Sequence, residues 1–138
     1  MAALMREAKR FFNQPQVIKN SIDIKNSINH RGYGNIGEEQ LDEVGHADWK
    51  ETFDMALDFP KDHPLAVKYP TAYGPNQNPS DPATLEVLQE YYVQAFQVAQ
   101  KLLTAMAEAL SLESDFFVRG FKDHVTVLRM IHYPPRPA

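Results

Sequence analysis

Apolar residues at helical spacing open the chain. They fall on one side of a helix until Pro15 stops it, and they are Leu4, Ala8, Phe11 and Phe12. A second, shorter helix is predicted within residues 18–28, where isoleucines recur among polar residues without a clean period. The start of the chain is therefore predicted to be helical.

The most regular pattern is an apolar stripe in the second half of the chain. Its members are three or four residues apart: Leu85, Leu88, Tyr92, Phe96, Ala99, Leu103, Met106 and Leu110. Asp81 can cap this helix, and Pro82 suits its first position. At 1.5 Å per residue the helix is roughly 40 Å long. The short elements before it cannot cover that length, so we expect the stripe to be partly exposed or covered by another copy or chain.

Two segments alternate at the period of a strand. Residues 49–57 place the following side chains on one face: Trp49, Glu51, Phe53, Met55 and Leu57. This alternation predicts a half-buried strand. Near the end, one face carries Leu128, Met130 and His132, and the other carries Arg129, Ile131 and Tyr133. We expect one of these faces to pack on the long helix.

The remaining segments are predicted to be irregular. Gly32, Gly34 and Gly37 favour an extended or turning segment, and their spacing is not that of a phosphate-binding loop. Six prolines in residues 59–82 predict a loop without any regular element. Residues 113–123 are predicted to form a further turn of helix that is broken at Gly120.

Composition narrows the classes of protein. The chain of 138 residues has a formal net charge of −4, 23% charged residues and no cysteine, which is ordinary for one globular domain and excludes disulfides. Basic residues gather in residues 1–31, but no nucleic-acid recognition motif accompanies them, so we expect no nucleic-acid partner. No apolar run could span a membrane and no secretory signal opens the chain, so a cytoplasmic protein is expected.

Few residues form a pattern that carries chemistry. His46 and Asp48 have the H-x-D spacing of facial iron sites, which on a strand places both side chains on one face. A third ligand would have to be distant, and Asp48 fits better as the cap of a turn before the strand. Glu38 and Glu39 are interpreted as solvated charges. No cysteine or G-x-S-x-G motif supports nucleophilic catalysis.

The last strand is the better candidate for a site. Arg129 and Tyr133 share a face on which a guanidinium fork and a phenol could hold a carboxylate. The pattern is equally consistent with an arginine that reaches solvent. Both interpretations stay open from the residues alone.

Several motifs together are similar to a known family. In order, they are RGYGNIGEEQLD, DWKETFDMAL, HPLAVKYPTAYGPNQNP, a YY pair near the start of the long helix, LSLESDFF and VLRMIHYPP. They resemble the isopenicillin N synthase-like non-haem iron oxygenases, most of which use 2-oxoglutarate. The resemblance implies an α+β, mainly helical fold, the N-terminal portion of a double-stranded β-helix (jelly roll) with one long helix backing a few strands. Residues 1–138 would form a single partial domain, with the first barrel strand at about 124–133.

The resemblance also implies where the site lies. In the family, the iron-binding H-x-D, a distal histidine and an R-x-S pair follow the Y-P-P turn, so His46 and Asp48 do not correspond to them. We therefore expect no catalytic residue and no metal ligand in this chain. Tyr133 matches a tyrosine that contacts substrate or co-substrate, and Arg129 and Ile131 share its face.

Two positions depart from the family pattern. Ile131 stands where many plant members carry an asparagine that helps to hold 2-oxoglutarate. Asn78 stands where the family commonly has tryptophan in N-x-W-P, and the loss of that ring removes apolar area from the loop. We therefore expect the contact with the co-substrate at Ile131 and the packing of the loop at Asn78 to differ from those of the family.

The resulting expectation is a partial oxygenase. The intact family uses Fe(II) and 2-oxoglutarate to oxidise a small organic substrate, whereas this chain alone is expected to bind neither cofactor and to be inactive. The alternatives are a non-catalytic helical module that dimerises or binds a partner through the long helix, a fragment, or one half of a split enzyme.

Overall fold

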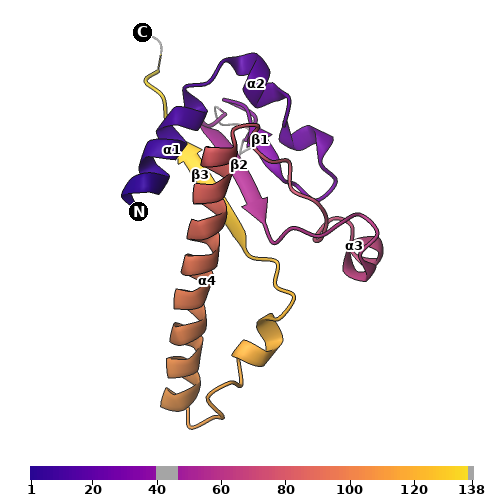
Figure 1. The fold of residues 1–138 in the computed structure, drawn as a ribbon, viewed down its shortest axis with the longest axis vertical. Helices are drawn as coiled ribbons and strands as arrows, with labels where there is room; N and C mark the ends of the chain where they lie inside the picture. Colours follow the sequence, from indigo (N-terminus) through magenta and orange to yellow (C-terminus); the bar gives the residue numbers. More distant parts are fainter. Residues whose placement is uncertain (40–46, 137–138) are drawn as a thin grey trace.

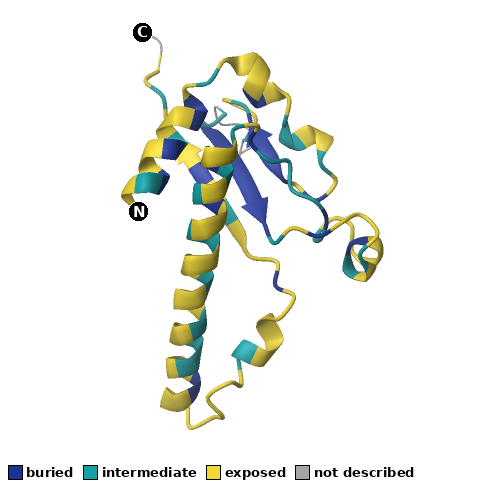
Figure 2. Cartoon of the chain, viewed as in Figure 1, coloured by how far each residue is buried: buried dark blue, intermediate teal, exposed yellow. Residues whose placement is uncertain are grey.

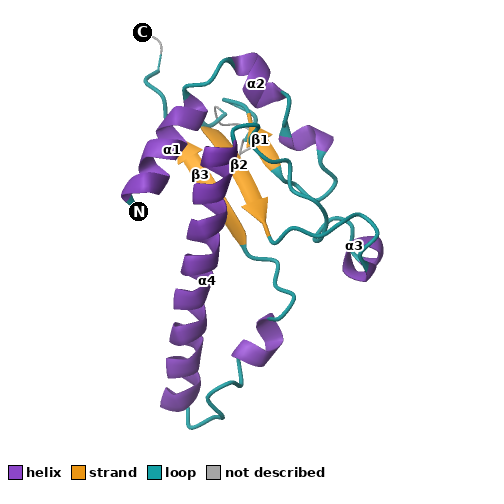
Figure 3. Cartoon of the chain, viewed as in Figure 1, coloured by secondary structure: helices purple, strands orange, loops and turns teal. Residues whose placement is uncertain are grey.

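The computed structural model describes residues 1–39 and 47–136, so His46 lies outside the described residues. Helices and strands follow one another along the chain as drawn in Figures 1 and 3. In order they are α1 (Ala2–Phe12), α2 (Gln16–Asn20), the 3-10 helix η1 (Ile24–Asn26), β1 (Gly32–Gly34), β2 (Glu51–Ala56), α3 (Pro64–Lys68), α4 (Pro82–Ala109), the 3-10 helix η2 (Val118–Phe121) and β3 (Val127–His132). The predicted first helix and the long helix are confirmed. The second helix, predicted within residues 18–28, is confirmed in part, since α2 begins earlier and ends at Asn20 and only η1 follows in that range.

The three strands form an antiparallel sheet in the order β1-β2-β3. Phe53 in β2 pairs with Tyr33 in β1 and with Met130 in β3, so the middle of each strand lies in one row. β2 is thus bounded by a strand on each side, and β3 lies at an edge of the sheet.

The prediction that β2 is half-buried was wrong, because all six of its residues are buried. On one face, Phe53 and Met55 lie in the hydrophobic core. On the other, Asp54 is covered by Arg129, and the side chain of Asn76 bonds the backbone N–H and C=O of Ala56 at 3.0 and 2.8 Å. These covering groups come from distant parts of the chain, so the local alternation of β2 does not indicate them.

The core lies between the sheet and helices α1 and α4 (Figure 1). It consists of Leu4, Phe11, Phe12, Tyr33, Phe53, Met55, Leu88 and Met130. The rings of Phe11 and Phe53 are 5.1 Å apart, which joins α1 directly to the central strand. Met130 of β3 shares this cluster with Leu88 of α4, and Leu128 packs against it, so the expectation that one face of the last strand packs on the long helix is confirmed.

Helix α4 begins where the sequence predicts. Asp81 is its N-cap residue and Pro82 its first residue. The Asp81 carboxylate accepts a hydrogen bond from the Thr84 hydroxyl at 2.8 Å and pairs with Arg10 of α1 at 2.9 Å. The same hydroxyl oxygen lies 3.3 Å from the buried Glu7 carboxylate, so its one proton is shared between the two acceptors. The first turn of α4 is therefore fastened to α1 by polar contacts as well as by the core.

The second half of α4 extends beyond the sheet and is largely exposed (Figures 1 and 2). With 28 residues the helix is about 42 Å long. Large apolar side chains in this half are more than 50% exposed: Val98, Leu102, Met106 and Leu110. Met106 and the C-cap residue Leu110 belong to the predicted stripe, so the expectation that the stripe is partly exposed within this chain is confirmed.

Two local predictions were wrong. Residues 59–82 do contain a regular element, because His63 caps α3 by accepting the Leu65 N–H at 3.3 Å and Pro64 occupies its first turn. Pro70 comes only after this helix has ended, so it does not disrupt it. Gly120 does not break its helical turn but lies inside η2, where a Cβ would meet no atom within 4 Å.

Glu51, the first residue of β2, is a buried carboxylate that contacts residues from the first and the last parts of the chain. Glu51 is 3% exposed. Its Oε2 accepts hydrogen bonds from Lys19 at 2.6 Å and from the Tyr33 hydroxyl at 2.5 Å, and its Oε1 lies 2.7 Å from His132 Nδ1. Burial alone would raise the pKa of Glu51, but the hydrogen bonds from Lys19, Tyr33 and His132 outweigh it and lower that pKa.

Replacing this carboxylate is expected to destabilise the chain. Glu51→Gln leaves the Lys19 ammonium, which is 5% exposed, without its counter-charge, and such a loss costs about 3–5 kcal/mol of unfolding free energy. Because the folded pKa of Glu51 is lowered, its stabilisation is present above the unfolded value of about 4.3 and is lost as the pH falls. Urea unfolding between pH 3 and 7 measures both effects.

Glu38→Gln is the matched control, since Glu38 pairs with the exposed Lys25. It should leave the midpoint almost unchanged because exposed ion pairs contribute little. Equal stability of Glu51→Gln and the unaltered chain would refute the central role of this carboxylate.

Candidate functional site

Arg129 lies on the face of β3 opposite to the core, directly across from Asp54 in β2. Its Nε and Nη2 donate to Asp54 Oδ1 and Oδ2 at 2.8 and 2.7 Å, in a two-bond fork. The Asp54 side chain is only 4% exposed. Hydrogen bonding to Asp54 raises the pKa of Arg129. Asp54 therefore occupies one edge of Arg129, the arginine for which the sequence predicted a bound carboxylate.

The other edge of Arg129 contacts a second carboxylate. Its Nη1 lies 2.9 Å from Glu39 Oε1, while Glu39 Oε2 lies 2.8 Å from Lys50 Nζ. The hydrogen bond from Lys50, with the nearby charge of Arg129, lowers the pKa of Glu39 against the opposing effect of burial. Lys50 also binds Asp48 at 2.8 Å. Interpreting Glu39 as a solvated charge missed this bridge, because it joins residues that are 90 positions apart in sequence.

Ile131 and Tyr133 follow Arg129 toward the end of the chain. Ile131 is 47% exposed and pairs with Thr52 of β2, two residues along from the row of Asp54 and Arg129. Tyr133 comes directly after β3 and is 67% exposed. Just beyond it, the Trp49 indole N–H donates to the Pro135 carbonyl at 3.3 Å. Arg129 and Ile131 thus share one face of β3, and the role of these three residues in a pocket stays a prediction.

Histidines that could have held a metal make other contacts in the structure. His63 caps α3, and His132 binds Glu51. The His124 ring stacks on Phe96 with centroids 3.9 Å apart, and burial lowers its pKa. Within residues 1–39 and 47–136, no group of three or more metal-ligating side chains comes together. These residues therefore do not by themselves offer a site that fits iron.

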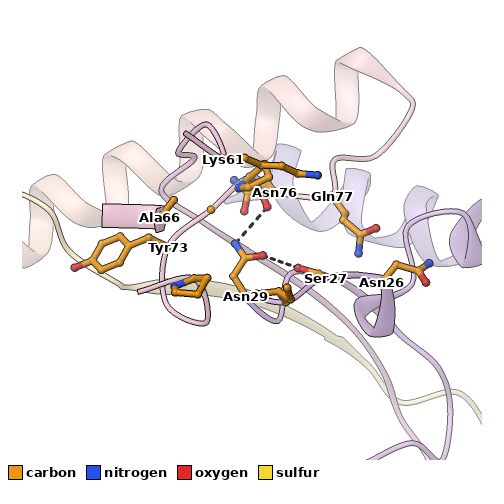
Figure 4. A pocket seen from close by; sticks show the side chains of 12 residues that line it. Asn26, Ser27, Asn29, Lys61, Ala66, Tyr73, Asn76 and Gln77 are labelled. Atoms are coloured by element: carbon orange, nitrogen blue, oxygen red, sulfur yellow. Dashed lines mark hydrogen bonds between the residues drawn. The ribbon is translucent and has the colours of Figure 1, made fainter. Parts of the chain in front are cut away.

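A cavity of about 480 Å³ lies away from β3, between residues 26–29 and 61–77 (Figure 4). Two amide side chains of its lining donate hydrogen bonds to backbone carbonyls of the chain. Asn29 Nδ2 donates to the Pro75 carbonyl at 3.3 Å, and Gln77 Nε2 donates to the Arg31 carbonyl at 2.8 Å. These amides hold the proline-rich segment against the start of β1, so we assign the cavity a structural role.

Asn78 is the loop position that departs from the family pattern. Among the described residues, the Asn78 side-chain oxygen is buried without a hydrogen-bond partner. A buried acceptor of this kind costs free energy. The effect on loop packing of having Asn78 in place of the family tryptophan stays a prediction.

No helix in the described part of the chain is both long enough and apolar enough to cross a membrane.

The chain belongs to a family of non-haem dioxygenases. Residues 1–81 match the family model described as "non-haem dioxygenase in morphine synthesis N-terminal". A 2-oxoglutarate-Fe(II) type oxidoreductase of Aspergillus fumigatus is 33% identical over 135 residues, which cover 94% of this chain and 40% of that protein. The oxidoreductase hxnY of Emericella nidulans, of the same named type, is 33% identical over 139 residues, covering 97% of this chain and 40% of that protein.

Solved structures agree with this assignment. A putative 2OG-Fe(II) oxygenase family protein from Caulobacter crescentus matches 99% of this chain and 44% of its own, with 32% identity and a TM-score of 0.82. A full-length Neurospora crassa protein, solved in complex with alpha-KG, matches 95% of this chain and 40% of its own, with 18% identity and a TM-score of 0.68, and shows the fold alone. The chain spans about 40% of the length of the curated relatives and corresponds to the front portion of these oxygenases.

The fork between Arg129 and Asp54 is expected to stabilise the sheet. Asp54→Asn removes the charge and one acceptor from a buried position, and losing a charge-assisted hydrogen bond costs about 2 kcal/mol of unfolding free energy. Thermal and urea unfolding of the purified chain measure this loss. Asp115→Asn, which removes an exposed partner of Arg119, is the control and should have no measurable effect. Equal effects of the two substitutions would contradict a stabilising fork.

Proposed function

We propose that this chain is the front portion of an Fe(II)- and 2-oxoglutarate-dependent oxygenase that oxidises a small organic substrate in the cytoplasm. The observation that carries the proposal is the match to the Caulobacter crescentus oxygenase family protein, which extends over 99% of this chain at 32% identity. When bound, iron and 2-oxoglutarate supply the activation of dioxygen. The described residues form no iron site, so we assign the metal ligands to the part of the family fold that this chain does not match.

The residues of this chain would build one wall of the substrate pocket. In this proposal β3 is the first strand of the barrel, backed by α4 on its core side. Its other face presents Arg129, Ile131 and Tyr133 toward the pocket. The exposure of Ile131 and Tyr133 supports this placement, since large apolar and aromatic side chains line most ligand pockets. Arg129 is oriented by Asp54, which fixes the direction of its remaining N–H donors.

A chimeric enzyme tests the proposal. Residues 1–138 joined to the unmatched remainder of the Caulobacter protein should give iron-dependent consumption of 2-oxoglutarate. In this chimera, Tyr133→Phe should raise the KM for 2-oxoglutarate about tenfold, which corresponds to one hydrogen bond. Tyr69→Phe, which alters an exposed tyrosine near α3, is the matched control and should change nothing.

The isolated 138-residue chain provides the second arm of this test. It is expected to bind no iron stoichiometrically, as measured by metal analysis after dialysis. Tight stoichiometric iron binding by the chain alone, or a folded chimera that consumes no 2-oxoglutarate, would refute the proposed division of the site.

A second candidate function is a non-catalytic interaction module or one half of a split enzyme. The observation that favours it is the set of exposed apolar side chains on the second half of α4, where Val98, Leu102 and Met106 are each more than 50% exposed. Exposed apolar surface of this kind typically marks a contact with another chain. Such a chain would be completed by a second copy or by a complementary chain.

Self-association of the purified chain tests this candidate. Sedimentation velocity over a hundredfold range of concentration is expected to show a dimer or larger species. Leu102→Lys together with Met106→Lys should shift the chain to monomer, because burying two ammonium groups in an apolar contact is unfavourable. Gln94→Lys with Gln97→Lys, on the exposed polar side of α4, is the charge-matched control. A chain that is monomeric at every concentration contradicts the self-associating form of this candidate.

A further inference from the structure

The two edges of the Arg129 guanidinium differ in how firmly they are held. The edge formed by Nε and Nη2 is fixed by Asp54, whose side chain is 4% exposed. The edge at Nη1 contacts Glu39, whose side chain is 40% exposed. Because exposed ion pairs contribute little to stability, Glu39 can leave Arg129 at low cost, whereas Asp54 cannot.

The Glu39 carboxylate contacts Arg129 and Lys50, the two cations that a ligand carboxylate would contact at this position. One oxygen binds Arg129 at 2.9 Å and the other binds Lys50 at 2.8 Å. Arginine and lysine converging on a carboxylate is an arrangement that proteins use to bind acids. With Glu39 displaced, Arg129 and Lys50 would have only Asp54 and Asp48 as carboxylate partners among these contacts, which leaves that group of four charges neutral.

We propose that Glu39 is an internal substitute for a ligand and that a small carboxylic acid binds between Arg129 and Lys50 by displacing it. The proposal rests on the proposed function where it takes this ligand to be the substrate or co-substrate of the oxygenase. It assigns to Glu39 the role of a competitor that sets the affinity of the site for acids.

The surroundings define the rest of the ligand. Glu39 and Lys50 line a cavity of about 160 Å³ together with Gly34 and Thr52. Gly34, Thr52 and Ile131 form one row across the sheet, two residues along from the row of Asp54 and Arg129 and therefore the next row on the same face. An acid bound at Arg129 would therefore place a body of a few carbon atoms over this row, against the half-exposed Ile131.

A titration of the purified 138-residue chain with butyrate, followed by nuclear magnetic resonance, tests the proposal. In the unaltered chain the tethered Glu39 competes at a high effective concentration, so butyrate should bind weakly. In Glu39→Gln the dissociation constant for butyrate should fall about tenfold, with the largest shifts at the Arg129 Nη1 and Lys50 Nζ proton signals, since these are the groups that Glu39 contacts. The neutral analogue butyramide should shift neither form.

Asp115→Asn is the matched control, because it removes the same charge from an exposed ion pair with Arg119, and neither residue lines this cavity. It should leave the affinity for butyrate unchanged. An equal gain in both variants, or no gain in Glu39→Gln, overturns the proposal. In the unaltered chain, saturating butyrate must also shift the Glu39 side-chain carboxyl carbon, and a carboxyl signal that does not move overturns it as well.

This experiment needs neither iron nor turnover, so its outcome is separate from that of the chimera. Binding of butyrate with an inactive chimera would support the site and refute the oxygenase. An active chimera without butyrate binding would refute only the displacement of Glu39.

Discussion

The fold depends on pairing two carboxylates carried by a fully buried strand. β2 lies between two other strands and is covered on both faces, yet it carries Glu51 and Asp54. Buried carboxylates are tolerated only when counter-charges and hydrogen bonds satisfy them. Lys19 supplies the counter-charge of Glu51 from the second helix, and Arg129 supplies that of Asp54 from the last strand. The central strand therefore requires both ends of the described chain to be in place.

This requirement explains which features the sequence could predict. Helix α4 was predicted within a residue of its start because Asp81, Pro82 and the apolar spacing are local signals. The burial of β2 was not predicted, since the residues that cover its polar face are separated from it by 20 or more positions. The bridge made by Glu39 was missed for the same reason. The placement of Arg129 and Ile131 on one face was predicted because strand alternation is local.

The exposed apolar surface of α4 and the edge position of β3 both leave groups available for contact with further residues. The second half of α4 leaves Leu102 and Met106 exposed, and β3 lies at the edge of the sheet. A sheet edge offers unpaired backbone groups, and an apolar helix face offers area to bury. The solved relatives have more than half of their length outside the matched region. Additional family-fold residues or another chain would therefore find both a strand to extend and a helix to cover.

Arg129 stabilises the sheet with one edge of its guanidinium and would bind a ligand with the other. A substitution that tests ligand binding without changing stability must therefore be made at a residue that contacts only the second edge. Its inner edge stabilises β2 through Asp54, so substitutions of Arg129 itself would change stability and ligand binding together. Glu39 contacts only the outer edge and is substantially exposed. A substitution of Glu39 therefore changes the proposed site while the Arg129–Asp54 pairing on which the sheet depends stays intact.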